Sequence, residues 1–171
     1  MNDTSSKRYD DYEPPTAPPL LDRVGVVADW SLPLNAKNDT VESFHGQFLG
    51  IGSSHRDTHI NHPDTRFAPR GTPCSGCRWF ESRIFINAER SHFLLYTVGA
   101  SIVDGEEPRY RAEWVVSAYE IIDLLTTFRP SEQPGGQRQQ SLSYAARRAL
   151  AQAANFDDRM RDAYEGRTAT L

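Results

Sequence analysis

The two cysteines of this chain, Cys74 and Cys77, have the C-x-x-C spacing of a two-thiolate metal half-site. Two histidines at H-x-x-H spacing, His59 and His62, precede them in the same segment. Zinc binds thiolates and imidazoles in a tetrahedron, and four protein ligands make a closed structural site. Gly76 permits the tight turn that brings both sulfurs to one point. The pattern therefore predicts a structural Zn2+ ion held by His59, His62, Cys74 and Cys77.

Other assignments of these residues stay open at this stage. His55 or His45 could replace His59 or His62 as a ligand, because both lie close enough along the chain. A C-x-x-C pair can also act as a redox dithiol, although no βαβ pattern surrounds this one. The remaining alternative is a metal-free partner-binding domain, in which the cysteines and histidines hold no metal.

Two enzyme classes share parts of this pattern. The string from Pro73 to Cys77 is similar to the P-C-x-x-C half of the zinc nucleobase deaminase signature. The H-x-E half is missing, because Gln47 follows His45 where the signature has its proton-transferring Glu. The histidine pair with C-x-x-C is also similar to HNH-type nucleases, with the elements in another order and without a second cysteine pair. A zinc-dependent enzyme acting on nucleobases or nucleic acid is therefore the alternative to a non-catalytic module.

Length and charge narrow the class of protein. The chain of 171 residues has the size of one domain and a net charge of −4. Residues 1–50 hold eight acidic and four basic side chains, whereas residues 55–115 hold eight of each. This distribution contains no basic stripe, which argues against nucleic-acid binding. No apolar run has transmembrane length and the N-terminus lacks a signal-peptide pattern, so we expect a cytoplasmic protein with reduced thiols and no membrane partner.

The middle of the chain has the hydrophobic pattern of a sheet. Residues 1–22 predict a disordered, acidic, Pro-rich tail, and residues 23–129 predict an α+β core. Strict alternation predicts a strand over residues 79–86, and further strands are expected over 92–103 and 109–116. Short apolar runs predict additional strands over 24–28 and 44–51, with a polar turn region between them. The expected sheet is an antiparallel meander of three to five strands.

Charged residues alternate with apolar ones along two of these strands. Glu81 and Arg83 share one face of their strand with Phe85, and Arg111 and Glu113 share one face of theirs. We expect the four charged side chains to form a cross-strand ladder on an exposed face of the sheet.

Two helices are expected after the sheet. Ser117 and Glu120 form a capping box, which predicts a helix over residues 117–128 packed on the sheet. Residues 130–140 are rich in Pro, Gly and Gln and predict a flexible connector. A long C-terminal helix is expected over 141–165, capped by Ser141 or Ser143 and ended by Gly166. Its small-residue stripe should pack on the body or meet a partner, such as a second copy of the chain; the stripe consists of Ala145, Ala149 and Ala153.

Three stretches are similar to uncharacterised proteins of actinobacteria and actinobacteriophages. They are Cys74–Ile86, Phe93–Gly99 and Ser117–Thr126. The resemblance implies a bacterial or phage origin and brings no activity, fold or ligand with it. The residues themselves predict an α+β fold with a small antiparallel meander sheet, a packed helix, a zinc-stabilised loop and a long C-terminal helix. The function expected is a non-catalytic interaction or regulatory module that binds a protein partner, a host protein if the chain is phage-encoded.

Overall fold

The computed structural model describes residues 22–37, 39–53, 78–101, 107–127 and 142–168. Three sequence predictions fall outside these residues. They are the N-terminal tail except its last residue, the His/Cys segment, and the connector at 130–140.

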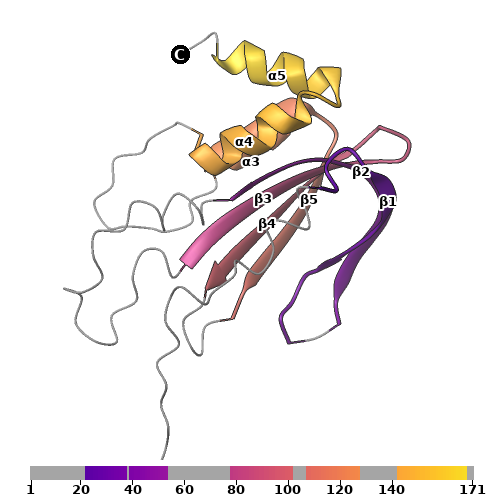
Figure 1. Ribbon diagram of the computed structural model, residues 1–171, viewed down its shortest axis with the longest axis vertical. Coiled ribbons are helices and arrows are strands. Elements are labelled where there is room, and N and C mark those ends of the chain that lie inside the picture. Colours follow the sequence, from indigo (N-terminus) through magenta and orange to yellow (C-terminus); the bar gives the residue numbers. More distant parts are fainter. Residues whose placement is uncertain (1–21, 38, 54–77, 102–106, 128–141, 169–171) are drawn as a thin grey trace, which may run out of the picture.

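In the described part of the chain, five antiparallel strands form one sheet in which each strand pairs with its neighbour in sequence (Figure 1). The meander expected from the alternation pattern is thereby confirmed with five strands. The strands are β1 (Val27–Pro33), β2 (Val41–Ser53), β3 (Arg78–Asn87), β4 (Phe93–Ser101) and β5 (Arg109–Val115).

The first strand starts later and runs further than the apolar run at residues 24–28 predicts. Residues 29–33, expected to be a polar turn region, continue β1. Trp30 and Leu32 are buried, whereas Asp29, Ser31 and Pro33, which alternate with them, are exposed. This alternation is typical of a strand with one buried face, and the short apolar run before it obscures the signal.

The long strand β2 bends, and its two halves pair with different neighbouring strands. Residues 41–47 pair with β1, and residues 46–53 pair with β3. The register with β3 shifts between Phe48 and Gly50, so Leu49 is an extra residue at a β-bulge. Bulges bend and twist a strand. We call β1 together with residues 41–47 of β2 the β1–β2 arm; it curves away from the plane of β3 to β5 (Figure 1).

The β1–β2 arm covers one face of the sheet, the arm-side face. The phenol of Tyr96 on β4 donates a 2.6 Å hydrogen bond to the carbonyl oxygen of Pro33 at the end of β1. The rings of Phe48 and Phe85 stack with centroids 4.6 Å apart. Burying such aromatic side chains stabilises the fold by roughly 1.5–3 kcal/mol each. The buried cluster on this face consists of Trp30, Leu32, Phe48, Ile51, Phe85, Leu94, Tyr96 and Val98.

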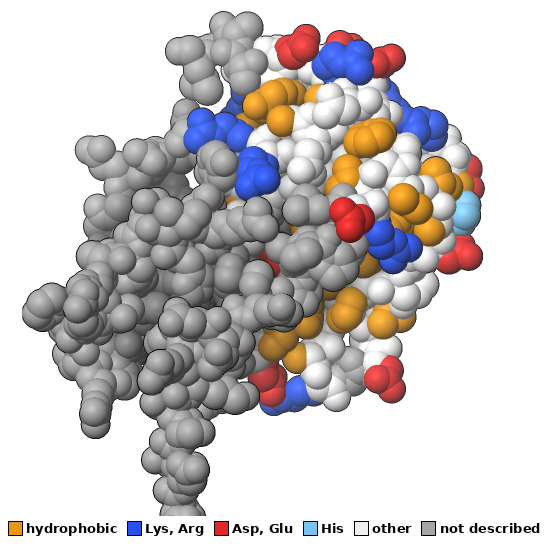
Figure 2. Space-filling view, in the orientation of Figure 1, with side chains coloured by type: hydrophobic (Ala, Val, Ile, Leu, Met, Phe, Trp, Pro, Cys, Tyr) orange, Lys and Arg blue, Asp and Glu red, His pale blue; other side chains and the backbone are white. Residues whose placement is uncertain are grey.

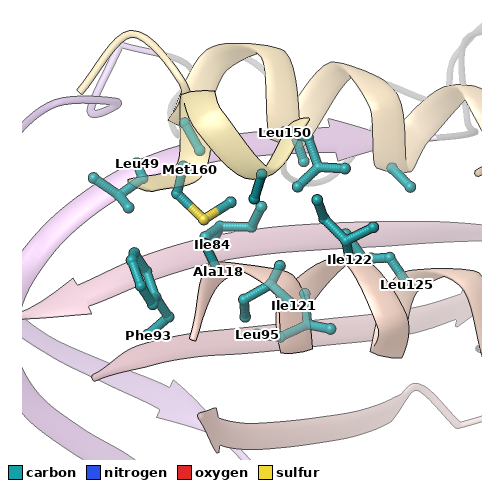
Figure 3. Close-up of a cluster of buried hydrophobic side chains, with 14 of the residues drawn as sticks. Leu49, Ile84, Phe93, Leu95, Ala118, Ile121, Ile122, Leu125, Leu150 and Met160 are labelled. Carbon is teal, nitrogen blue, oxygen red and sulfur yellow. The ribbon is translucent and has the colours of Figure 1, made fainter. Parts of the chain in front are cut away.

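Among the described residues, α3 (Ala118–Thr127) and α4 (Tyr144–Ala153) cover the opposite, helix-side face, and α5 (Asp158–Thr168) packs against these two helices (Figure 1). Aliphatic side chains of the sheet and helices interdigitate there, with Met160 of α5 among them (Figure 3). The cluster includes Leu49, Ile84, Ile86, Phe93, Leu95, Ile121, Ile122, Leu125, Leu150 and Met160. No helix among the described residues is long and apolar enough to cross a membrane.

The capping box at the start of α3 is present as predicted. Glu120 accepts hydrogen bonds from the amides of Val116 and Ser117, and Ser117 accepts one from the amide of Tyr119. Such bonds satisfy amides that have no partner inside the helix. Ser143 caps α4 in the same way, by accepting from the amide of Ala146 at 3.1 Å.

The small-residue stripe of α4 packs on the sheet. Ala145, Ala149 and Ala153 are buried, and they face Gly50 and Gly52 of β2. A Cβ atom at Gly52 would overlap the carbonyl oxygen of Ala145, and one at Gly50 would overlap that of Ala149. The helix and strand backbones therefore approach too closely for any larger residue at these positions. Self-association through this helix, as considered from the sequence, would have to use its other faces.

The single helix expected over residues 141–165 is two helices. The chain turns after Ala153, and α5 begins at Asp158 and continues through Gly166, which does not end it. Asp157 is the residue that starts α5: its Oδ1 accepts from the amides of Arg159 and Met160 at 3.0 and 3.3 Å. A side-chain acceptor at this position favours a new helix start over continuation of the old helix.

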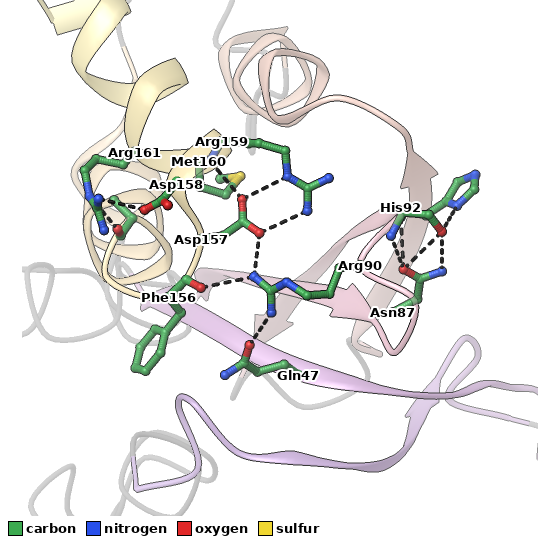
Figure 4. Close-up of polar contacts among 12 residues, drawn as sticks. Gln47, Asn87, Arg90, His92, Phe156, Asp157, Asp158, Arg159, Met160 and Arg161 are labelled. Atoms are coloured by element: carbon green, nitrogen blue, oxygen red, sulfur yellow. Dashed lines mark hydrogen bonds and ion pairs between the residues drawn. The ribbon is translucent and has the colours of Figure 1, made fainter.

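Asp157 also joins three separate elements (Figure 4). Its Oδ2 accepts from Arg90 in the β3–β4 turn at 2.6 Å and from Arg159 at 3.0 Å, and the side chain is only 3% exposed. Arg90 also donates to Gln47 of β2 at 3.0 Å. Burial alone would raise the pKa of Asp157, but the hydrogen bonds and positive charge of Arg159, the Met160 amide and Arg90 outweigh it and hold the pKa below its ordinary value.

Candidate functional site

The predicted metal ligands His59, His62, Cys74 and Cys77 lie outside the described residues, as does the alternative ligand His55. The structure does show where their segment is attached. It leaves the sheet after Ser53, at the end of β2, and returns at Arg78, the start of β3. Ser53 is paired with Glu81 in the β2–β3 ladder. Both ends of the segment are therefore fixed on neighbouring strands at one end of the sheet.

His45, the other alternative ligand, lies on β2 far from this attachment. Gly46, next to it, pairs with Asn87 at the opposite end of β3. Ser53 is eight positions after His45 along β2, which corresponds to roughly 26 Å along the strand at 3.3 Å per residue. Where side chains are described, no group of three or more His, Cys, Asp or Glu residues could hold a metal ion.

His45 instead forms an exposed pair with Asp29. Its Nδ1 lies 2.8 Å from Asp29 Oδ1 across the β1–β2 ladder, and the two side chains are 54% and 93% exposed. A carboxylate on Nδ1 orients an imidazole so that Nε2 faces outward, which is the arrangement of a general base. Ser31 and Ser43, the next pair along the same face, contact each other at 3.4 Å between their Oγ atoms. Their contact is with each other, so these four residues do not make the Ser–His–Asp relay that nucleophilic catalysis needs.

Gln47 has a structural role that does not fit the deaminase pattern. It lies on β2, its Nε2 donates to the carbonyl oxygen of Gly25 at 2.9 Å, and its Oε1 accepts from Arg90. In the deaminase signature the residue at this spacing is a Glu that transfers protons beside the metal. His45 and Gln47 therefore supply neither the carboxylate nor the position that this chemistry requires.

The predicted exposed charge ladder is wrong in two respects. Glu81 and Arg83 are buried on the arm-side face of β3, with 2% and 9% exposure. Arg111 and Glu113 pair with each other on β5, on the helix-side face. β4 lies between the two strands, so the two pairs are neither adjacent nor on one face. Phe85, expected to be exposed beside Glu81, is buried in the arm-side cluster.

Glu81 and Arg83 form a buried ion pair directly beneath the attachment of the His/Cys segment. The Nε and Nη2 atoms of Arg83 donate to Glu81 Oε2 at 3.2 and 2.7 Å. The guanidinium also lies over the ring of Tyr96, 5.6 Å from its centroid. Burial raises the pKa of the Tyr96 phenol, which the positive charge of Arg83 offsets only in part, so the phenol stays a neutral donor to Pro33.

This polar cluster lies near the end of the sheet with its two charged groups buried and paired. Two buried charges are costly unless they are paired and hydrogen-bonded, and these two are. Glu81 is also the ladder partner of Ser53, so the ion pair on β3 lies where the β2–β3 ladder holds the attachment of residues 54–77. We therefore take the attachment formed by Ser53, Arg78, Glu81, Arg83 and Tyr96 as the candidate functional site.

Charges of both signs are mixed over the rest of the visible surface. Figure 2 shows basic and acidic side chains next to each other on the described face, with apolar side chains between them. On that face the basic side chains do not gather into the stripe that phosphate binding requires.

Comparisons of the chain with protein-family models, with curated proteins and with solved structures found no match.

The sequence patterns did not predict two features of the structure. The Asp29–His45 pair joins residues sixteen positions apart, and only the β1–β2 register brings them together. The Asp157 cluster had a local signal, since an Asp two residues before Arg159 can cap a helix start. The Ala-rich pattern before it favoured one continuous helix and hid that signal.

Proposed function

We propose that this protein is a non-catalytic binding module whose sheet presents residues 54–77 to a protein partner. In this proposal a structural zinc ion, held by His59, His62, Cys74 and Cys77, orders that segment. The observation that carries the proposal is the attachment of residues 54–77: they connect the paired ends of β2 and β3, next to the buried Glu81–Arg83 ion pair.

This attachment suits recognition for a physical reason. Binding loops are typically long segments on a rigid scaffold, because the scaffold fixes their ends and leaves their side chains free for a partner. Here the scaffold is the ladder from Ser53 to Glu81, supported by Arg83 and Tyr96. A zinc ion bound by two thiolates and two imidazoles would supply the remaining order within the segment.

The chemistry of the described residues supports binding over catalysis. The Asp29–His45 pair is exposed on an open strand surface, and the two serines beside it contact each other. Glu81 and Arg83 neutralise each other in the interior. A partner surface needs none of these groups to titrate or to react.

The first test is the zinc content of the untagged protein, measured by inductively coupled plasma mass spectrometry. We expect about one zinc per chain, lost in Cys74→Ser and in His59→Ala. His45→Ala is the matched control, because His45 lies far from the attachment and should leave the metal bound. Wild-type protein without zinc would refute the metal part of the proposal.

Zinc binding by itself does not separate a binding module from a zinc enzyme. X-ray absorption at the zinc edge counts the ligands: two sulfurs and two nitrogens indicate a closed structural site. Three protein ligands and a water would favour the enzyme alternative, since catalytic zinc keeps an open position. Capture of a protein partner by the wild type and not by Cys74→Ser would support the role of the segment in recognition.

A further inference from the structure

β5 is an edge strand in the part of the chain that the structure describes. It pairs with β4 and with no strand on its other side. An open edge presents unpaired backbone amide and carbonyl groups that can pair with another strand. The order of residues along this edge is Arg109, Tyr110, Arg111, Ala112, Glu113, Trp114 and Val115.

This sequence is complementary to itself when one copy runs antiparallel to another. With Ala112 opposite Ala112 of a second copy, Arg111 faces Glu113 and Glu113 faces Arg111. On the other side of the same strand, Tyr110 faces Trp114 and Trp114 faces Tyr110. Opposite charges and aromatic pairs directly across an antiparallel ladder are stabilising.

We propose that two copies of this chain associate through their β5 edges, antiparallel and with the two-fold axis at Ala112. The five-stranded sheets then join into one continuous sheet of two copies. The contact is isologous, so it closes at two copies and leaves no further β5 edge open.

Charge selects this register over its neighbours. Moving the axis by one residue places either Arg111 opposite Arg111 or Glu113 opposite Glu113. Like charges directly opposite each other destabilise a ladder. Within one chain Arg111 and Glu113 already form an ion pair on the helix-side face. In the proposed register, Arg111 and Glu113 of the two copies form a group of four charges. Each arginine then lies beside the glutamate of its own strand and opposite the glutamate of the other copy.

The side chains that the register uses are accessible and held in place. Arg111 and Glu113 are 57% and 26% exposed. Trp114 is 36% exposed, and its ring is fixed from the arm side: Nε1 donates to Glu42 at 2.7 Å, and Phe44 packs edge-on with centroids 5.1 Å apart. A ring held in this way loses little freedom when a second strand docks beside it.

Charge-reversal variants test the register directly by analytical ultracentrifugation of the full chain. We expect wild type to be dimeric, and both Arg111→Glu and Glu113→Arg to dimerise at least about tenfold more weakly, because each places like charges opposite each other. The double variant Arg111→Glu, Glu113→Arg should dimerise again. An equimolar mixture of the two single variants should form a heterodimer, because their opposed pairs are then complementary.

Arg109→Glu is the matched control, since Arg109 is exposed on the same face of β5 and faces Val115 in this register. It should leave the dimer intact. Far-ultraviolet circular dichroism establishes that each variant is folded. A wild type that is monomeric over a wide concentration range overturns the proposal. So does a dimer that all variants leave unchanged, which would place the contact elsewhere, or one that neither the double variant nor the mixture restores.

Discussion

Replacing Asp157 with Asn probes the contact that holds α5 on the sheet. In Asp157→Asn one side-chain oxygen can still accept from the Arg159 and Met160 amides, so the helix start is retained. The second oxygen becomes an NH2 group, which cannot accept from Arg90 or from the Arg159 guanidinium. Donors then face donors in a position where the side chain is 3% exposed.

The size of the effect follows from these contacts. A hydrogen bond to a charged group contributes roughly 1.5–3 kcal/mol when it is buried. The Arg90 and Arg159 side chains are 46% and 47% exposed, so hydrogen bonds to water replace part of the hydrogen bonding that each loses with Asp157. We expect Asp157→Asn to lower the free energy of unfolding by about 2 kcal/mol. The control Asp158→Asn removes an exposed pair with Arg161 and should cost below about 0.5 kcal/mol.

Urea unfolding at several pH values tests both the size and the cause. The folded pKa of Asp157 is lowered, so its stabilisation is present above the unfolded pKa of about 4 and is lost as the pH falls through the folded pKa. The difference between wild type and Asp157→Asn should therefore be full at neutral pH and shrink below about pH 4. Equal effects of Asp157→Asn and Asp158→Asn, or a difference that does not change with pH, would refute this reasoning.

Two further substitutions test the packing of the sheet. Gly52→Ala should destabilise the fold by about 3 kcal/mol or prevent folding, because the added methyl overlaps the Ala145 backbone. Thermal unfolding is the assay, and Gly99→Ala is the control. The control should be far milder, because a Cβ at Gly99 meets only ordinary contacts. Arg83→Met should lower the free energy of unfolding in urea by about 3 kcal/mol, because it removes the ion pair that Arg83 makes with the buried carboxylate of Glu81. The double variant Glu81→Gln, Arg83→Met should recover part of that loss, and no recovery would contradict the assigned pairing.

Local sequence patterns predicted where the helices and strands are more accurately than they predicted which face of each element is buried. The alternation in β3 and β5 and the Ser117–Glu120 capping box each depend on residues within one element, and the structure confirms them. The face of an element that becomes buried depends on what packs there. Glu81 and Arg83 looked like an exposed pair because nothing near them in sequence shows that their face of β3 becomes buried.

The candidate site was predictable only as a set of residue types. The C-x-x-C and H-x-x-H spacings identify a metal-binding pattern without placing it, and the described residues establish only where the segment is attached. The break before α5 shows a second limit. High helix propensity in residues 145–154 favoured continuation, whereas the buried contacts of Asp157 with Arg90, distant in sequence, favour a new start.

The packing of α4 on β2 has a consequence for how the protein is made. The Gln152 side chain accepts a hydrogen bond from the amide of Ile51, 101 positions earlier in the chain, and Gly50 and Gly52 contact the backbone of α4. During synthesis all five strands therefore leave the ribosome before the helix that covers them. Until then the aliphatic side chains of β2 and β3 on this face lack the cover that α4 provides, and exposed sheet faces of this kind are prone to aggregation. Nascent chains stalled before residue 144 should bind chaperones, and release should follow once α4 has emerged.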